Sequence, residues 1–225
     1  MKIDNDQSRI GFPKRLLLLD LDGVLLDSRE NMRQSWRQVC ERLGVTVGFN
    51  SYFAEIGIPF ARIMDRLGLA EQAEEIESVF RIASMENLDL ARFYPDVIET
   101  LSEIGSAGIN MGIVTSKDKL RTNAILAMLP ITFACVRTPD PAMRGKPAPD
   151  HLLAAMAEVG ADPAETLYIG DMDADHEAAV RARIDYAHAA WGYGKPPEDE
   201  STILSELRDL NELVLGPDRR QRQSQ

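Results

Sequence analysis

Short apolar runs alternate with amphipathic segments along most of the chain. Four of these runs are bounded by charged or turn-forming residues and predict buried strands at residues 16–19, 111–114, 132–136 and 167–169. Between them, helical patterns begin near Pro95 and Pro149 and end at Gly108 and Gly160. Because strands and helices alternate, we expect an α/β fold with a doubly wound parallel sheet and helices on both faces.

Residues 28–93 interrupt this alternation. Three segments, at residues 31–44, 59–68 and 70–88, have apolar positions at helical spacing, and no strand is expected among them. The pattern predicts an all-helical domain inserted after the first strand. It divides the chain into a core of residues 1–27 and 94–225 and a helical domain of residues 28–93. We expect the polar end of the chain, residues 216–225, to be disordered.

Composition and charge exclude several classes of protein. No run approaches the roughly 18 apolar residues that a membrane-spanning helix needs. A net charge of -11 among 225 residues argues against a nucleic acid or an anionic membrane as partner, because both would be repelled. The first residues lack an apolar signal segment, and Cys40 and Cys135 are the only two cysteines, so we expect a cytoplasmic protein.

Polar residues follow the predicted strands. Asp20 and Asp22 end the first apolar run, and in an extended segment they point to the same side. Thr115 and Ser116 end the second run, where their hydroxyls and free backbone N–H groups suit a phosphate oxygen or simply cap a helix. Lys146 lies in a loop stiffened by prolines. Parallel sheets bind ligands at the carboxyl ends of their strands, so these side chains are expected to converge.

Three more carboxylates follow the last predicted strand. Asp171 and Asp175 are four residues apart and share a face if a helix begins between them, whereas Asp173 is expected to point away. Together with Asp20 and Asp22 they would repel one another, at about 4 kcal/mol for a pair ~4 Å apart at a dielectric of 20. Lys146 and a bound divalent cation are the candidates that balance this charge. Hard oxygen ligands suit Mg²⁺.

The stretches DLDGVLLDS, IVTS, GKPAPD and YIGDMDAD resemble, in order, the four motifs of the haloacid dehalogenase superfamily of hydrolases. The helical insertion is similar to that superfamily's helical cap, and the core would then be its Rossmann-like domain. The stretches FYPDVIETL and AWGYGKPPED further resemble the branch of phosphoglycolate phosphatases, related pyrophosphatases and phosphosugar mutases.

This resemblance implies a Mg²⁺-dependent phosphatase that acts on a small-molecule phosphate monoester through an aspartyl-phosphate intermediate. Asp20 would be the nucleophile and Asp22 the general acid and base. Thr115 and Lys146 would complete the catalytic set, and Gly23 and Ser116 would contribute to substrate binding. The metal site would comprise Asp20, Asp22, Asp171 and Asp175, with Asp175 as a partner of Lys146 or of a metal-bound water.

Several alternatives remain open. A phosphosugar mutase or other phosphotransferase, a pyrophosphatase and a nucleotidase would use the same core residues, and a binding protein without turnover is a further class. Specificity is expected to come from the cap, where Arg62 is a candidate for binding an anionic leaving group or a solvent-exposed helix residue. The oligomeric state is expected to be monomer or homodimer.

Overall fold

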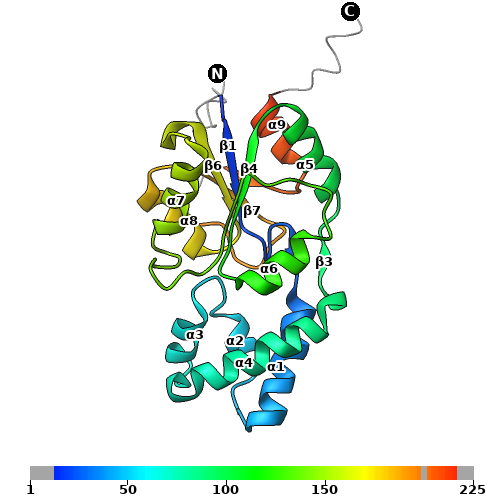
Figure 1. Cartoon of the computed structure of the whole chain (residues 1–225), viewed down its shortest axis with the longest axis vertical. Helices are drawn as coiled ribbons and strands as arrows, with labels where there is room; N and C mark the ends of the chain where they lie inside the picture. Colours follow the sequence, from blue (N-terminus) through cyan, green and yellow to red (C-terminus); the bar gives the residue numbers. More distant parts are fainter. Residues whose placement is uncertain (1–12, 199–201, 217–225) are drawn as a thin grey trace, which may run out of the picture.

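The computed structural model describes residues 13–198 and 202–216. The segment expected to be disordered lies outside these residues except for Gly216, as does most of the N-terminal segment. Six strands pair in parallel in the order β5-β4-β1-β6-β7-β8, which confirms the predicted parallel sheet (Figure 1). The strands are β1 Leu16–Leu19, β4 Asn110–Val114, β5 Cys135–Arg137, β6 Thr166–Gly170, β7 Asp185–Ala189 and β8 Ile203–Leu204.

The central strand β1 explains why the sheet is covered on both faces. All four of its leucines are fully buried, and alternate side chains enter different apolar clusters. Leu17 and Leu19 join the cluster that contains residues of α5, α6 and α9, whereas Leu16 and Leu18 join the cluster of α7 and α8. The core helices are α5 Val97–Ser106, α6 Lys119–Leu126, α7 Asp150–Val159, α8 Asp173–Ala182 and α9 Asp209–Leu215, with the 3₁₀ turn η3 Pro163–Glu165.

The expected helix boundaries are confirmed at α5 and α7. Helix α5 begins two residues after Pro95, and Gly108 follows its end with a φ of 84°. Pro149 directly precedes α7, and Gly160 ends it in the left-handed conformation. Glycine adopts this conformation without the steric cost that a Cβ imposes, so local sequence chemistry sets these ends.

The strand predictions need correction in several places. The third strand lies at Cys135–Arg137 rather than at residues 132–136, and β7 was missed because Asp185 and His188 interrupt its apolar pattern. The expectation that residues 28–93 contain no strand is wrong at their end, where β3 Arg92–Phe93 pairs antiparallel with β2 Leu26–Asp27. Strands of two residues carry too little periodicity to be recognised in a sequence.

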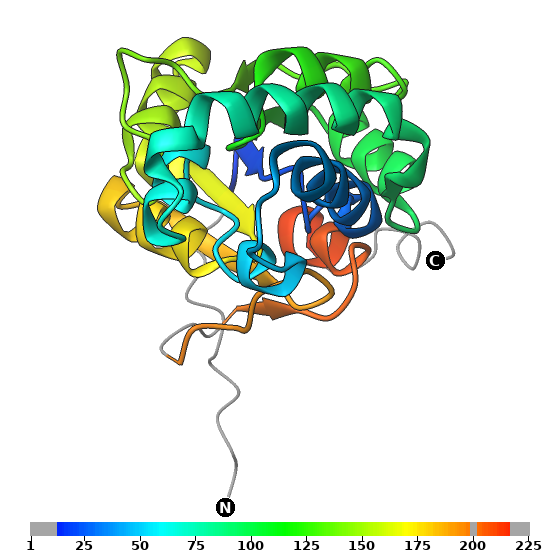
Figure 2. The same cartoon turned by 90° about the horizontal axis from the view of Figure 1, so that it is seen from below.

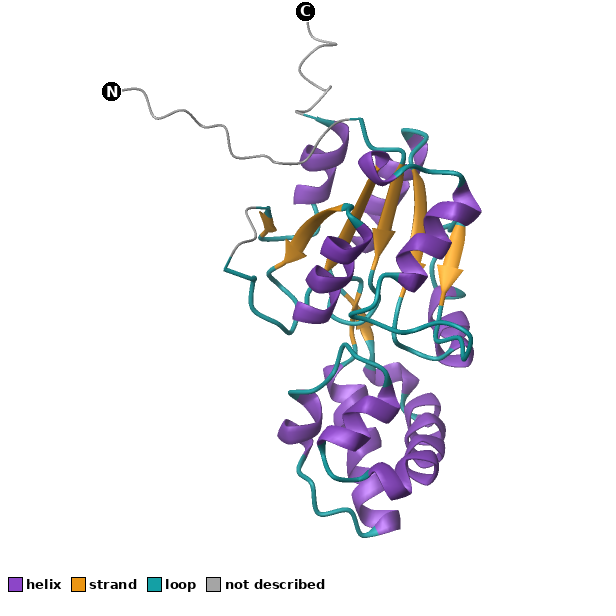
Figure 3. Cartoon of the chain, turned by 90° about the vertical axis from the view of Figure 1, so that its left-hand side faces the viewer, coloured by secondary structure: helices purple, strands orange, loops and turns teal. Residues whose placement is uncertain are grey.

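The inserted helices form a separate body beyond the carboxyl ends of the strands (Figure 3), and they lie in front of the sheet when the molecule is seen from below (Figure 2). They are α1 Arg29–Leu43, α2 Phe49–Phe53, α3 Phe60–Arg66, η1 Ala70–Gln72, α4 Ala73–Glu86 and η2 Leu88–Leu90. Their own apolar cluster includes Trp36 stacked on Tyr52 with ring centroids 4.3 Å apart. The β2–β3 pair joins this helical cap to the core, while the division at residues 27 and 93 remains a prediction. No helix of the described residues is long and apolar enough to cross a membrane.

Candidate active site

Three neighbouring strands bring the predicted catalytic residues to one edge of the sheet. Asp20 follows β1, Thr115 follows β4, and Asp171 follows β6. The backbone N–H of Asp20 still donates to Ile169 O at 2.9 Å, and that of Thr115 to Arg137 O at 3.0 Å. Pairing with the adjacent strands therefore fixes the backbone up to the point where the polar side chains begin.

Asp20, Asp171 and Asp175 form a buried cluster. One oxygen of each lies within 4.8 Å of the others, and the residues are 4%, 0% and 0% exposed. Burial, together with the charges of Asp175 and Asp22, raises the pKa of Asp20 to about 7 even though Lys146 opposes the shift. Burial and the charges of Asp175 and Asp20 also raise the pKa of Asp171 well above its ordinary value. The cluster therefore favours an added positive charge.

Lys146 supplies one of the positive charges. Its Nζ lies 3.0 Å from Asp20 Oδ1 and 2.6 Å from Asp175 Oδ1, and it donates to the Tyr168 hydroxyl at 3.1 Å. Burial alone would lower the pKa of Lys146, but Asp175 and Asp20 raise it above its ordinary value. The amine therefore remains charged and fixed between two carboxylates.

Asp175 is held by its neighbours on all sides. Its Oδ1 accepts from the Tyr168 hydroxyl at 2.8 Å, and its Oδ2 accepts from the backbone N–H groups of Asp171 and Met172 at 3.3 and 3.1 Å. Asp173 is exposed, as the helical spacing predicted. This arrangement fits Asp175 for positioning Lys146 and for shaping the first turn of α8.

The remaining carboxylate oxygens fit a hard divalent cation. Tyr193 N donates to Asp171 Oδ2 at 2.7 Å, but no described residue donates a hydrogen bond to the buried Asp171 Oδ1, and the buried Asp20 Oδ1 pairs with Lys146 Nζ at 3.0 Å. The cluster contains carboxylates only, with no described histidine or cysteine among its members, which suits Mg²⁺ better than zinc. Gly23 permits the close approach, since a Cβ there would lie 2.1 Å from Asp171 Oδ2.

Asp22 faces a different part of the site. Its Oδ1 accepts from Ser28 Oγ at 2.5 Å, and its Oδ2 forms an ion pair with Lys117 Nζ at 3.1 Å. Thr115 is buried, and its Oγ1 accepts from Lys117 N at 3.2 Å. Ser116 reaches the cap, where its Oγ donates to Gly57 O at 3.1 Å. Asp22 and Ser116 thus contact the cap side of the site.

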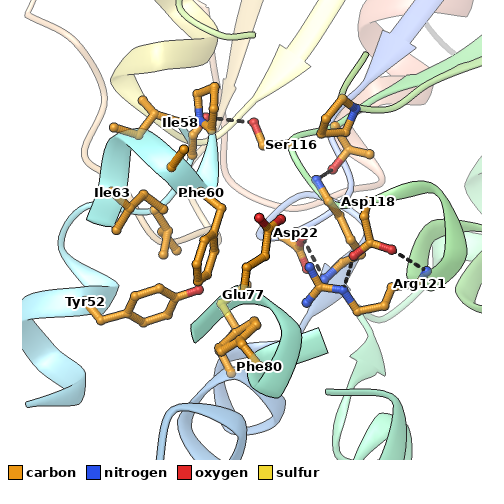
Figure 4. Close-up of a pocket in the computed structure, with 18 of the residues that line it drawn as sticks. Asp22, Tyr52, Ile58, Phe60, Ile63, Glu77, Phe80, Ser116, Asp118 and Arg121 are labelled. Carbon is orange, nitrogen blue, oxygen red and sulfur yellow. Dashed lines mark hydrogen bonds and ion pairs between the residues drawn. The ribbon is translucent and has the colours of Figure 1, made fainter. Parts of the chain in front are cut away.

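A cavity of about 250 Å³ lies between the sheet edge and the cap (Figure 4). Asp20, Asp22, Thr115 and Ser116 line it from the core, and residues of α2, α3 and α4 line it from the cap. Arg62 is exposed and does not line the cavity, so the hypothesis that it reaches the leaving group is not supported. Ile63 and Met64 occupy the buried face of α3 and leave Arg62 on its outer side.

The sequence interpretation missed several charged residues of this cavity. Lys117 and Asp118 directly follow Ser116, and their position after a strand end was a usable signal. Arg121 follows on α6, where its Nε contacts Asp118 Oδ2. Glu77 and Arg81 come from α4, and nothing in an ordinary helical i, i+4 pair indicates that it faces a site.

Comparisons with known proteins agree with this geometry. The sequence model of the haloacid dehalogenase-like hydrolase family matches residues 17–189. The chain belongs to this family. Among curated relatives of this hydrolase, a phosphoglycolate phosphatase of Aquifex aeolicus is 30% identical over 89% of this chain and 96% of its own. The pyrophosphatase PpaX of Oceanobacillus iheyensis is 27% identical, with the same shares covered.

Solved structures show the same fold for the hydrolase. A Lactobacillus plantarum protein superposes with a TM-score of 0.82 at 23% identity, over 90% of this chain and all of its own. A hydrolase from Pseudomonas syringae gives a TM-score of 0.77 at 25% identity, over 89% of this chain and 98% of its own. The expected Rossmann-like core with a helical cap is therefore confirmed.

Proposed function

We propose that this hydrolase cleaves a small-molecule phosphate monoester with the help of Mg²⁺, through an aspartyl-phosphate intermediate. The observation that carries the proposal is the buried carboxylate pair of Asp20 and Asp171: Asp171 Oδ1 has no hydrogen-bond donor among the described residues, and Asp20 Oδ1 lies 3.0 Å from Lys146 Nζ. Phosphatase and pyrophosphatase relatives support the same chemistry.

In the first step, Asp20 would attack phosphorus. A bond forms between its carboxylate oxygen and phosphorus, while the bond from phosphorus to the ester oxygen breaks. Lys146 lies 3.0 Å from Asp20 Oδ1 and neutralises negative charge there, and the Thr115 hydroxyl and nearby backbone N–H groups would hold a phosphoryl oxygen. Asp22 would give its proton to the leaving oxygen, which departs as an alcohol.

In the second step, a water molecule would attack the phosphorus of the aspartyl phosphate. Asp22, now a carboxylate, takes the proton of that water, and the bond between Asp20 and phosphorus breaks. Inorganic phosphate leaves, Asp20 is ionised again, and Asp22 is protonated again. Ser28 Oγ, 2.5 Å from Asp22 Oδ1, keeps the acid in one position during both steps.

Asp20 and Asp171 would hold the Mg²⁺ through their carboxylate oxygens, together with the Asp22 backbone carbonyl that the family resemblance implies. The bound ion would supply charge neutralisation for the phosphoryl group and for the converging carboxylates. Asp175 would act on the site through Lys146, because both of its oxygens are already engaged.

Phosphate release from a panel of monoesters and from pyrophosphate tests the proposal, with Mg²⁺ and with a chelator. We expect Mg²⁺-dependent release that falls by at least about 10³-fold in Asp20→Asn and in Asp171→Asn. Asp173→Asn is the matched control, since it removes an exposed carboxylate from the same segment and is expected to keep full activity. Release that persists with chelator, or in Asp20→Asn, would overturn the proposal.

The ester, the oligomeric state and the cytoplasmic location remain predictions. A small phosphate ester as the partner follows from the proposed chemistry. The expected lack of nucleic acid or membrane partners still rests on the net charge of -11.

A further inference from the structure

The charges that line the cavity are already paired with one another. The cations are Arg81, Lys117 and Arg121, and the carboxylates are Asp20, Asp22, Glu77 and Asp118. Arg81 lies 2.6 Å from Glu77 and 3.6 Å from Asp118, which also pairs with Arg121. Lys117 pairs with Asp22 at 3.1 Å. An anionic leaving group would therefore meet four carboxylates and three cations, and no lining cation lacks a carboxylate partner among the described residues.

The cap supplies an apolar wall opposite Asp22 (Figure 4). Tyr52, Phe60 and Phe80 form an aromatic group, with ring centroids 5.4 Å apart between Tyr52 and Phe80 and 5.7 Å apart between Phe60 and Phe80. Ile58 and Ile63 extend this wall. Such a surface stabilises an apolar face of a ligand and gives nothing to a carboxylate or a second phosphate.

One polar atom of this wall is left for the ligand. Tyr52 is held by its stack on Trp36, and no hydrogen bond among the described residues involves its hydroxyl. Burial raises the pKa of Tyr52 far above its ordinary value, so the hydroxyl stays neutral and can donate or accept. It is suited to an uncharged hydroxyl of the ligand.

From this arrangement we infer that the cavity selects a phosphate monoester whose leaving alcohol is uncharged and has an apolar face, and that Glu77 rejects anionic leaving groups. The inference rests on the proposed phosphatase function. It makes Glu77 a residue that determines specificity and takes no part in the chemical steps. It also separates this site from one built for phosphoglycolate, whose leaving group carries a carboxylate.

Two esters of nearly equal size test the inference: 2-hydroxyethyl phosphate, which is neutral in its leaving group, and 2-phosphoglycolate, which is anionic. We expect the wild-type kcat/KM for 2-hydroxyethyl phosphate to exceed that for 2-phosphoglycolate by about 10-fold or more. Phenyl phosphate, which presents an aromatic face, should also be preferred over 2-phosphoglycolate. Glu77→Gln should lower the ratio of the first two esters by about 5-fold or more, mainly by improving 2-phosphoglycolate.

Glu75→Gln is the matched control, because it makes the same charge change on an exposed position of α4 outside the cavity. It should leave the ratio unchanged. A wild-type preference for 2-phosphoglycolate, or equal ratios in Glu77→Gln and Glu75→Gln, would overturn the inference while the phosphatase function stands. Absence of release from all esters, including the broad panel, would instead remove the proposed function.

Discussion

Asp20 is costly to ionise when no cation beyond Lys146 is bound. Its folded-state pKa is about 7, above the ordinary value of 3.8, because burial and the charges of Asp175 and Asp22 outweigh Lys146. Between these two values the folded protein keeps a proton that the unfolded chain has lost. The free energy of unfolding therefore falls as pH rises through this range, by at most about 1.4 kcal/mol per pH unit for this group.

Asp20→Asn removes this titration and gives the first prediction. In chelator, the variant should gain stability relative to the wild type as pH rises from about 5 to about 7, with the difference levelling off above that. Saturating Mg²⁺ should stabilise the wild type more than the variant, because the variant lacks a carboxylate for the ion. Urea unfolding at several pH values measures both. An equal pH slope in wild type and variant would show that Asp20 ionises normally.

Gly23 gives the second prediction, which concerns its effect on stability and on the position of the Asp171 carboxylate. Its φ is 84°, and a Cβ would lie 2.1 Å from Asp171 Oδ2, so Gly23→Ala combines backbone strain with displacement of a carboxylate. Gly44→Ala is the control, because Gly44 also has a positive φ, of 67°, and has no atom within 4 Å of an added Cβ. Both should lower the free energy of unfolding by about 1 kcal/mol from strain.

Only Gly23→Ala should also weaken Mg²⁺ binding, by about 10-fold or more. Calorimetric titration with Mg²⁺ distinguishes the two variants. Equal affinities in Gly23→Ala and Gly44→Ala would mean that Asp171 moves aside without consequence, and that Gly23 serves the turn alone.

At the scale of elements, the junction of β2 and α1 links Asp22, the proposed general acid, to the loop after β7. Ser28, just before α1, bonds Asp22 through its Oγ, and its backbone N–H donates to the Tyr193 hydroxyl at 2.7 Å. That hydroxyl also contacts Asp27 Oδ1 at 3.1 Å. A segment far along the chain therefore holds the first turn of the cap and, through it, Asp22.

Tyr193→Phe should lower the free energy of unfolding by about 1 kcal/mol, since the Ser28 N–H then loses its partner in a buried place. It should also lower kcat, because Ser28 no longer holds Asp22 in one orientation. Ser28→Ala separates the two effects: it should lower kcat while leaving the bond from the backbone N–H to Tyr193 intact. Chemical unfolding and steady-state kinetics measure them. The prediction is wrong if Tyr193→Phe matches the wild type in both.

Elements could be predicted from sequence where a single local pattern decides them. The four leucines of β1, and the Pro and Gly residues that bound α5 and α7, carry their own signals. Strand β7 carries no such signal, because a polar residue interrupts its apolar pattern. The core accommodates this residue, His188, whose Nδ1 lies 3.1 Å from the Tyr186 hydroxyl. Tertiary contacts made this segment a strand, and no local rule records them.

At the scale of the whole molecule, the residues on the core side of the cavity could be predicted from the sequence, whereas those on the cap side could not. Asp20, Thr115 and Asp171 converge because parallel strands end at one edge, a rule that needs no knowledge of packing. Glu77 and Arg81 reach the cavity only through the way α4 lies over the core, which the sequence does not encode in a short pattern. Arg62 was chosen by its nearness to a loop, and the packing of α3 turned it outward.

The contact between Ser116 and the cap shows how closure of the two parts can be measured. Its Oγ donates to Gly57 O at 3.1 Å, across the cavity from the loop after β4 to the loop before α3. A bond of this kind contributes about 0.5–1.5 kcal/mol. Movement of the cap away from the core would break this bond, so Ser116→Ala should favour an open cap and raise KM by roughly 3- to 10-fold. The free energy of unfolding should change by less than about 0.5 kcal/mol, because neither apolar core is touched.

Ser116→Thr keeps the hydroxyl and is expected to retain most of the wild-type KM, which separates the bond from the loss of side-chain volume. Inhibition by inorganic phosphate provides a second measurement. Because the cap would also close over bound phosphate, the inhibition constant in Ser116→Ala should rise by the same factor as KM. If KM and phosphate inhibition both stay at wild-type values in Ser116→Ala, the bond does not hold the cap closed. In that case Met172, which belongs to the core and packs against the apolar cluster of the cap, would be the next candidate for the closing contact.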